Sequence, residues 1–477
     1  MWCRDCLLPA LTGAVLAVSV AGAAAQGAPP PAAAEGTSPA PDPGGLWQRS
    51  ALLGDAGGLR PWLARQGITL GLQETSEVFA NVSGGVHRGA DYDGLTQMNL
   101  GLDTRKAFGW AGGTFTVSAL QIHGRSLSAD NLDNLQTISG IEAAPTSRLW
   151  ELWYQQAFLH GRLDIKLGQQ SLDEEFMTSR GSGLFVNTMM GWPMVPSADL
   201  YAGGPAYPLS SLGVRLRVRP TPALTVLAGV FDDNPSGGPF ATDSQLRGAE
   251  ADGAAFSLNT GALWIAELQY AVNRARPGAP PPRGLPGTYK LGVWYDSATF
   301  PDQRLDTTGR SLADPASSGV ARMHRGNFSL YAVADQTVWR PGPQSARAVS
   351  LFLRVMGAPP DRNLISFSAN GGLTVTDPLP GRDDDTFGIG FGVAKVSGDA
   401  ASLDRATAAF TGTPYPVRGT ETFLELTYQV QLAPWWQVQP DFQYVFNPGG
   451  GIENPSNPPR RIADEAVFGV RTVVTLW

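Results

Sequence analysis

Eight side chains combine aromatic, amide, carboxylate and guanidinium groups at alternate positions of extended segments. They are Glu151, Trp153, Gln155, Arg215, Arg217, Glu425, Asp441 and Gln443. Aromatic rings pack against C–H surfaces, while carboxylates, amides and guanidinium groups form paired hydrogen bonds with hydroxyls, so the combination suits sugars. The alternative at each position is a structural role in a charge ladder between neighbouring strands. Nothing beside them has the spacing of a catalytic or metal site, so we expect no catalytic residue, metal or cofactor.

The elements that must position these side chains are β-strands. From Ile68 onward, apolar and polar residues alternate with the two-residue period of a strand. The segment 420–432 is the clearest example, because Leu424 and Leu426 fall on one face and Glu425 on the other. Read in this way, the chain contains about sixteen strands of about 9–14 residues, long enough to cross a membrane. The predicted spans are 68–82, 94–106, 111–123, 148–160, 162–170, 211–219, 223–233, 261–272, 287–298, 326–339, 346–357, 363–374, 385–396, 419–432, 435–446 and 464–477, of which the third, seventh and tenth alternate poorly.

The connections differ in length on the two sides of such a sheet. The long ones, all from an odd to an even strand, are 124–147, 171–210, 299–325, 397–418 and 447–463. Tight turns at Gly161 and at 220–222 lie on the opposite side, a pattern typical of outer-membrane barrels. Because hydrocarbon offers backbone groups no hydrogen-bond partner, a sheet spans a membrane only when it closes on itself. The sequence therefore predicts an all-β protein, a closed antiparallel transmembrane β-barrel of about sixteen strands, apolar outside and wet inside.

Composition narrows the alternatives. Of 477 residues only 16% are charged, below the ~25% of soluble domains, and the net charge of −7 provides no basic surface for nucleic acid. Beyond the N-terminus no run of eighteen apolar residues would form a membrane-spanning helix. A soluble β-sandwich or propeller stays the alternative fold, although no blade-length repeat is visible.

The chain divides into four parts. They are a signal peptide (1–25), a Pro/Ala/Gly-rich periplasmic linker (26–51), a short amphipathic helix (52–67) and the barrel (68–477). The first part joins an apolar run to the small residues Ala23–Ala25, as cleaved export signals do. Both cysteines, Cys3 and Cys6, lie within it, so we expect an exported chain without disulfides.

The longest connection, 171–210, is rich in Trp, Phe, Met, Tyr, Pro and Gly. So long and apolar a loop is costly to leave in water, and we expect it to fold into the pore. The alternative is a surface lid packed on other loops. In the last strand, Trp477 shares the parity of Arg471. We expect Arg471 to face the lumen and Trp477 to turn outward beyond a bulge, because an arginine facing lipid costs about 2–4 kcal/mol.

Several stretches together carry a family resemblance. They are GDAGGLRPWLARQGITL (54–70), LWELWYQQAFLHGRLDIKLGQ (149–169), YPLSSLGVRLRVRPTPALTVLAGVFDDNP (207–235), YKLGVWYDSATFPD (289–302), PPDRNLISF (359–367), PGRDDDTFGIGFG (380–392) and ELTYQVQLAPWWQVQPDFQYVFNPGG (425–450). From about Leu52 to Trp477 the chain resembles the OprB-type carbohydrate-selective porins of Gram-negative outer membranes. The resemblance implies a sixteen-stranded barrel in the cell outer membrane that lets small, glucose-type sugars diffuse across, and it brings no catalytic residue.

Two other functions stay open at this point. Arg215, Arg217 and Arg219 would suit a general or anion-preferring porin. A barrel enzyme would need a Ser–His–acid group on its outer wall, and the four histidines, His87, His123, His160 and His324, lie in no recognisable nucleophile motif. We expect small sugars and outer-membrane lipid as partners and leave open the association of several copies.

Overall fold

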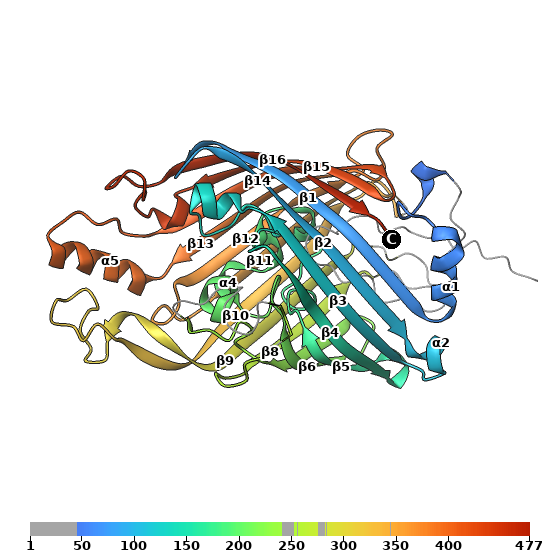
Figure 1. The fold of residues 1–477 in the computed structure, drawn as a ribbon, viewed down its shortest axis with the longest axis horizontal. Helices are drawn as coiled ribbons and strands as arrows, with labels where there is room; N and C mark the ends of the chain where they lie inside the picture. The colour runs from blue at the N-terminus through green and yellow to red at the C-terminus, as the bar shows by residue number, and fades with distance from the viewer. Residues whose placement is uncertain (1–44, 241–251, 255, 275–281, 283, 344) are drawn as a thin grey trace, which may run out of the picture.

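The computed structural model describes residues 45–240, 252–254, 256–274, 282, 284–343 and 345–477. The expected signal peptide, and the expected linker up to residue 44, lie outside these residues. Sixteen antiparallel strands form one closed barrel in which each strand pairs with its neighbours in the sequence (Figure 1). The strands are β1 (Ile68–Gly85), β2 (Gly89–Asp103), β3 (Gly113–Gly124), β4 (Thr146–Phe158), β5 (Leu163–Gln170), β6 (Ser211–Val218), β7 (Leu224–Phe231), β8 (Leu263–Val272), β9 (Gly287–Asp306), β10 (Ala321–Trp339), β11 (Ala348–Gly357), β12 (Ile365–Thr376), β13 (Thr386–Val396), β14 (Thr420–Ala433), β15 (Trp436–Phe446) and β16 (Ala463–Thr475). The predicted fold class is confirmed.

The barrel closes where the first strand meets the last. β1 pairs with β16 over a register that runs from Gln73 opposite Thr475 to Gly85 opposite Ala463. Arg471 is buried on the inward face, where its guanidinium pairs with the Glu77 carboxylate of β1. β16 ends before Trp477, whose backbone N–H donates to the Leu72 carbonyl of β1 at 3.2 Å. The closure leaves no unpaired edge between the two ends of the chain.

Alternation along the strands separates an outward from an inward face. On β14, Leu424 and Leu426 are 47% and 44% exposed, whereas Glu425 is 1% exposed and contacts residues inside the barrel. The strands that alternate poorly in sequence have apolar residues on both faces. Inward-facing Leu227 of β7 and Val333 of β10 are buried in the same interior cluster. The interior is therefore less uniformly polar than the sequence suggests.

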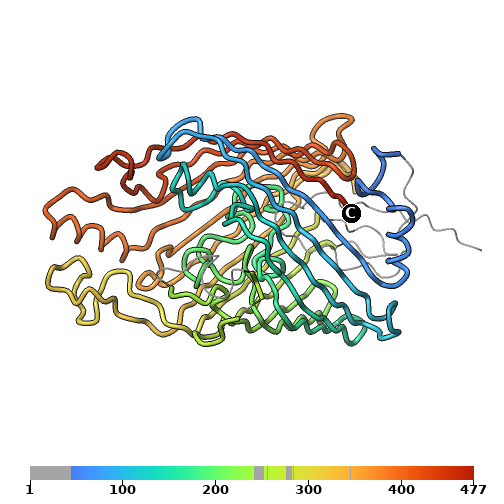
Figure 2. The backbone as a smooth tube through the Cα atoms, viewed as in Figure 1, coloured from blue at the N-terminus to red at the C-terminus, as the bar shows by residue number. Residues whose placement is uncertain are grey.

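The described connections end at two rims, as Figure 2 shows along the backbone tube. The terminal rim, where Leu52 lies beside Thr475, holds the tight turns and two short helices, α1 (Leu59–Arg65) and α2 (Thr104–Phe108). The opposite rim, which we call the loop rim, holds the long connections and α5 (Gly398–Thr411). None of the helices in the described ranges is both long and apolar enough to cross a bilayer.

Some predicted boundaries are wrong. The strand expected at 94–106 stops at Asp103, because its carboxylate accepts the Arg105 N–H at 2.8 Å and caps α2. Nearly half of the loop expected at 299–325 is strand, since β9 and β10 stay paired as far as Asp306 opposite Ala321. The loop expected at 397–418 contains α5, which begins where the Ser397 hydroxyl accepts the Ala400 N–H.

Candidate functional site

The segment 171–210 contacts inward-facing side chains around most of the barrel. It contains two short helices, α3 (Thr188–Gly191) and α4 (Met194–Asp199), and its apolar side chains are buried. The buried cluster they form with the wall includes Phe176, Phe185, Val186, Met189, Met190 and Val195 from the segment and Phe79, Phe231, Phe352 and Phe423 from the strands. These contacts remove a large apolar area from water, which favours this position of the segment.

A first group of hydrogen bonds that holds the segment 171–210 comes from β14 and β15. Glu425 accepts the backbone N–H of Val186 at 2.5 Å, and the Asn187 side-chain amide donates to Gln443 at 3.0 Å. Gln443 also donates to the Ile138 carbonyl at 2.8 Å, which connects the segment 125–145 to the same wall. Because these polar groups are already bonded to backbone, they hold the two segments rather than present free groups to a solute.

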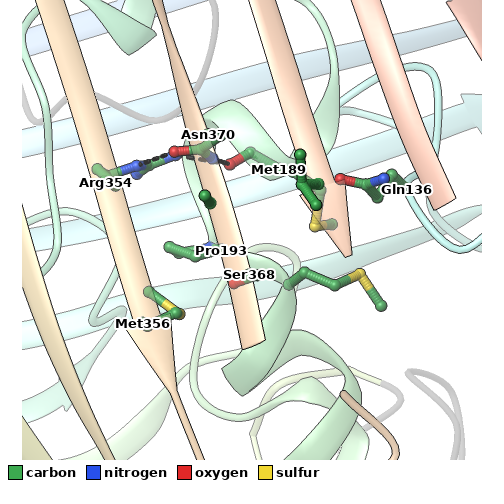
Figure 3. A pocket seen from close by; sticks show the side chains of 10 residues that line it. Gln136, Met189, Pro193, Arg354, Met356, Ser368 and Asn370 are labelled. Atoms are coloured by element: carbon green, nitrogen blue, oxygen red, sulfur yellow. Dashed lines mark hydrogen bonds between the residues drawn. The ribbon is translucent and has the colours of Figure 1, made fainter. Parts of the chain in front are cut away.

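A second group of hydrogen bonds to the segment comes from Arg354 of β11, which is 1% exposed. Its guanidinium donates to the backbone carbonyls of Met177, Met189, Met190 and Gly191, at 2.6–3.1 Å. The fifth N–H, on Nε, donates to the side chain of Asn370 on β12 at 2.9 Å. All five guanidinium donors are therefore used, the full capacity of an arginine. Figure 3 shows Arg354, Asn370 and Met189 joined in this way.

A network of ion pairs on β5 and β6 also holds the segment. The Lys166 ammonium lies 2.7 Å from the Glu175 carboxylate, and Arg215 Nε lies 2.7 Å from the other Glu175 oxygen. Arg215 and Arg217 both pair with Asp164, Arg217 at 2.7 Å. Burial raises the pKa of Glu175, but the charges of Lys166 and Arg215 outweigh it and hold this pKa at about 2. The network keeps residue 175 charged and fixed to the wall at neutral pH.

The three candidates on β4 lie beside this network. Glu151 accepts the backbone N–H of Ser171 at 3.0 Å, where the segment 171–210 begins. The Lys166 ammonium stands 4.5 Å from the centre of the Trp153 ring, and Gln155 accepts a hydrogen bond from Arg215 at 2.8 Å.

The eight predicted residues all face inward, and the structure divides them into two groups. Glu151, Trp153, Gln155, Arg215 and Arg217 come together around β4–β6, whereas Glu425, Asp441 and Gln443 lie together on β14 and β15. Their contact with a sugar stays a prediction. Sequence reasoning missed Asp164, Lys166, Glu175 and Arg354. The charged positions of LDIK (163–166) share one strand face and were a usable signal, but Arg354 stands between apolar residues on both faces.

Amides are prominent among the inward groups toward the terminal rim, where threonines and charged side chains such as Asp164, Lys166 and Arg217 also face inward. Eight inward-facing amide residues lie in the terminal half of the strands, namely Gln73, Gln97, Asn99, Gln155, Gln269, Gln429, Gln431 and Gln437. Some of them bond to one another, as Gln437 does to Gln431 at 2.8 Å. Amides both donate and accept hydrogen bonds and carry no net charge, so this part of the lumen suits neutral hydroxylated solutes.

A small cavity remains between the segment 171–210 and the wall of β11–β13. It measures about 10 Å³, room for about one water molecule. Figure 3 shows side chains around it from the strands, among them Arg354, Ser368 and Asn370, and from the connecting segments, among them Gln136, Met189 and Pro193. Among the described residues no group of three or more His, Asp or Glu side chains is placed to hold a metal ion.

A closed barrel with an apolar outer wall, an inward-folded segment and a polar lining defines a porin, a channel of the outer membrane. The chain belongs to the carbohydrate-selective porin, OprB family, whose model matches residues 87–476. It is a sugar-selective channel of the outer membrane, and its family is one of channels rather than enzymes.

Relatives agree with this assignment. The chain is 26% identical to Porin B of Pseudomonas aeruginosa over 416 residues, which cover 84% of this chain and 87% of that protein. It is 24% identical over 428 residues to the putative porin QuiX of Acinetobacter baylyi, with 84% and 89% covered. The high-pH structure of Pseudomonas putida OprB superimposes with a TM-score of 0.79 at 25% identity and covers 90% of this chain and 98% of that one.

Proposed function

We propose that this channel passes glucose-type monosaccharides by passive diffusion, with the segment 171–210 setting the width of the path. The observation that carries the proposal is that the buried charged groups around the segment are bonded to protein partners. The charged groups around the segment, such as Arg215, Arg354 and Glu425, are buried and bonded to protein partners. The amides that line the terminal half of the strands exchange hydrogen bonds with sugar hydroxyls without binding tightly.

The eight predicted residues take different parts in this proposal. Trp153, Gln155 and Arg217 are half-buried and remain accessible from the lumen, so we assign them to sugar contact. Glu151, Arg215, Glu425, Asp441 and Gln443 are nearly fully buried and bonded, so we assign them to holding the walls of the path. We further propose that the terminal rim faces the periplasm and that the apolar outer wall contacts outer-membrane lipid.

The test is reconstitution of the purified protein into liposomes and planar bilayers. We expect glucose to enter liposomes faster than neutral solutes of similar size that lack hydroxyls, and to reduce the channel current as its concentration rises. Equal entry rates for all small solutes would contradict sugar selectivity and support a general porin. A current carried mainly by chloride would support an anion-preferring porin, which the buried ion pairs of Arg215 disfavour.

A further inference from the structure

Three buried aspartates lie under the loop rim, where β7 ends and β8 begins beside β9. Asp232 and Asp233 follow directly after β7, and Asp296 lies on β9. The register places the end of β7, the start of β8 and Asp296 in one row, through the pairs Phe231–Leu263 and Leu263–Asp296. The three aspartates are 5%, 1% and 0% exposed, so protein encloses all three carboxylates.

These carboxylates lack the hydrogen-bond donors that buried carboxylates need. Both oxygens of Asp233 and one oxygen each of Asp232 and Asp296 accept no hydrogen bond of normal geometry. The other two oxygens are used in local turns, since Asp232 accepts the Asn234 N–H at 3.3 Å and Asp296 accepts the Ala298 N–H at 2.9 Å. A buried charge without a partner is among the most costly arrangements in a protein.

The carboxyl groups of Asp233 and Asp296 lie side by side, close enough for a hydrogen bond if one of them held a proton. Among the described residues, no lysine, arginine or histidine forms an ion pair with either of them or with Asp232. Like charges therefore face one another with no protein cation to offset their repulsion. The arrangement calls for a positive charge between the two carboxylates.

We propose that a calcium ion binds between the Asp233 and Asp296 carboxylates. Ca²⁺ takes about six to eight oxygen ligands at about 2.3–2.6 Å, so neighbouring ligand oxygens lie about 3 Å apart, as two carboxylates in contact do. Two carboxylates rather than three would hold the ion, because the described part of the chain contains no three-residue acidic group with that geometry. The Thr260 hydroxyl, which lies near Asp233, and water would add ligands, while Asp232 would add its charge.

The ligand types distinguish calcium from other cations. Mg²⁺ requires a near-ideal octahedron at about 2.0–2.1 Å and gives up its water reluctantly, so it fits an enclosed pair of carboxylates less well. The chain has no cysteine beyond residue 6 and no histidine between 161 and 323. The sulfur and nitrogen ligands that zinc prefers are therefore absent from β7, β8 and β9.

The ion would fasten the connection after β7 to β9 beside the inward-folded segment. Tyr201 of that segment donates to the Thr299 carbonyl at 2.9 Å, three residues beyond Asp296. Its ring also packs edge-on against Phe300, with the ring centres 5.6 Å apart. Calcium would therefore stabilise the part of the wall on which this end of the segment rests.

Titration of the purified full chain with calcium tests the proposal. The folded barrel is stripped with EDTA in detergent and titrated with CaCl₂ alone, with calorimetry and native mass as readouts. We expect one Ca²⁺ per chain, weaker binding of Mg²⁺, and a melting temperature that rises with Ca²⁺ concentration, because the ion binds the folded state. If no ion binds at about 10 mM CaCl₂, above the Kd range of extracellular calcium modules, the proposal is wrong and the two carboxylates share a proton.

Two variants and a matched control assign the site. Asp233→Asn and Asp296→Asn should each weaken Ca²⁺ binding at least about tenfold, yet melt above the unmodified protein in EDTA, because the new amide donates to the remaining carboxylate. Asp306→Asn is the control, since Asp306 is also 0% exposed on β9 but accepts hydrogen bonds from Thr308 and Ser318. It should melt lower and keep its Ca²⁺ affinity. Unchanged affinity in both site variants, or an equal loss in the control, would overturn the proposal.

Discussion

Replacing Arg354 by methionine should release the segment 171–210 from the wall of β11. The substitution removes all five donors from a site that is 1% exposed. Each buried carbonyl left without a donor costs about 1–3 kcal/mol. If water reaches two of the four carbonyls and two stay dry, the seated position loses about 2–6 kcal/mol. The equilibrium between the seated and the released segment then shifts by about thirtyfold to twenty-thousandfold.

Single-channel recording in planar bilayers measures this shift. We expect Arg354→Met to show a second, larger conductance level or rapid switching between two levels, together with weaker block by glucose. Arg354→Lys keeps the charge but not the planar five-donor geometry. Its conductance and glucose block should therefore lie between those of the unmodified channel and those of Arg354→Met. Arg347→Met is the control, because Arg347 pairs with Asp377 at a turn and is 36% exposed.

One result would refute the reasoning. If Arg354→Met forms a folded barrel with the conductance, current noise and glucose block of the unmodified channel, the guanidinium does not set the position of the segment. Asn370→Ala protects the test against a folding failure, since it removes only the bond to Nε and the contact with the Met189 carbonyl. Asn370→Ala should change the conductance and the glucose block in the same direction as Arg354→Met, but to a smaller extent.

Three further predictions concern other charged residues. Arg471→Met leaves Glu77 buried and unpaired, so thermal unfolding should show a loss of about 3–5 kcal/mol, and an unchanged melting temperature would contradict the pairing. The folded pKa of Glu175 is about 2, below its ordinary value, so its contribution is present at neutral pH and disappears as the pH falls toward 2. Glu175→Gln should therefore melt below the unmodified protein at pH 7, with the difference closing in acid, and a difference independent of pH would oppose this. Arg217→Ala should raise the permeability ratio of cations to anions measured from reversal potentials, whereas Arg215→Ala should mainly lower stability; identical effects would show that burial does not separate their roles.

The barrel was predictable from sequence because alternation reports directly on which face meets lipid. Leu424, Glu425 and Leu426 indicate their faces unambiguously, and the observed strands follow the predicted ones closely. The strand ends were less predictable. The pairing of β9 and β10 beyond Phe300 depends on contacts between the two strands and not on a local pattern.

The site was predictable only in part. The alternation along the strands identified Arg215 and Glu425 as inward-facing. It carries no information on which groups these side chains contact inside the barrel. Their partners, Glu175 and the backbone of Val186, lie in a long connection without periodicity. Arg354 was missed because Phe352 shares its inward face, so the strand appears apolar on both sides.

Closure of the wall by β1 and β16 has a consequence for assembly of the channel in the cell. Until residue 475 has been delivered, the edge of β1 exposes a row of amide and carbonyl groups, and the Glu77 carboxylate has no cation beside it. β16 therefore completes both the hydrogen-bond ladder and the buried ion pair. A chain truncated before Arg471 should be retained and degraded as an open sheet instead of surviving as a smaller pore.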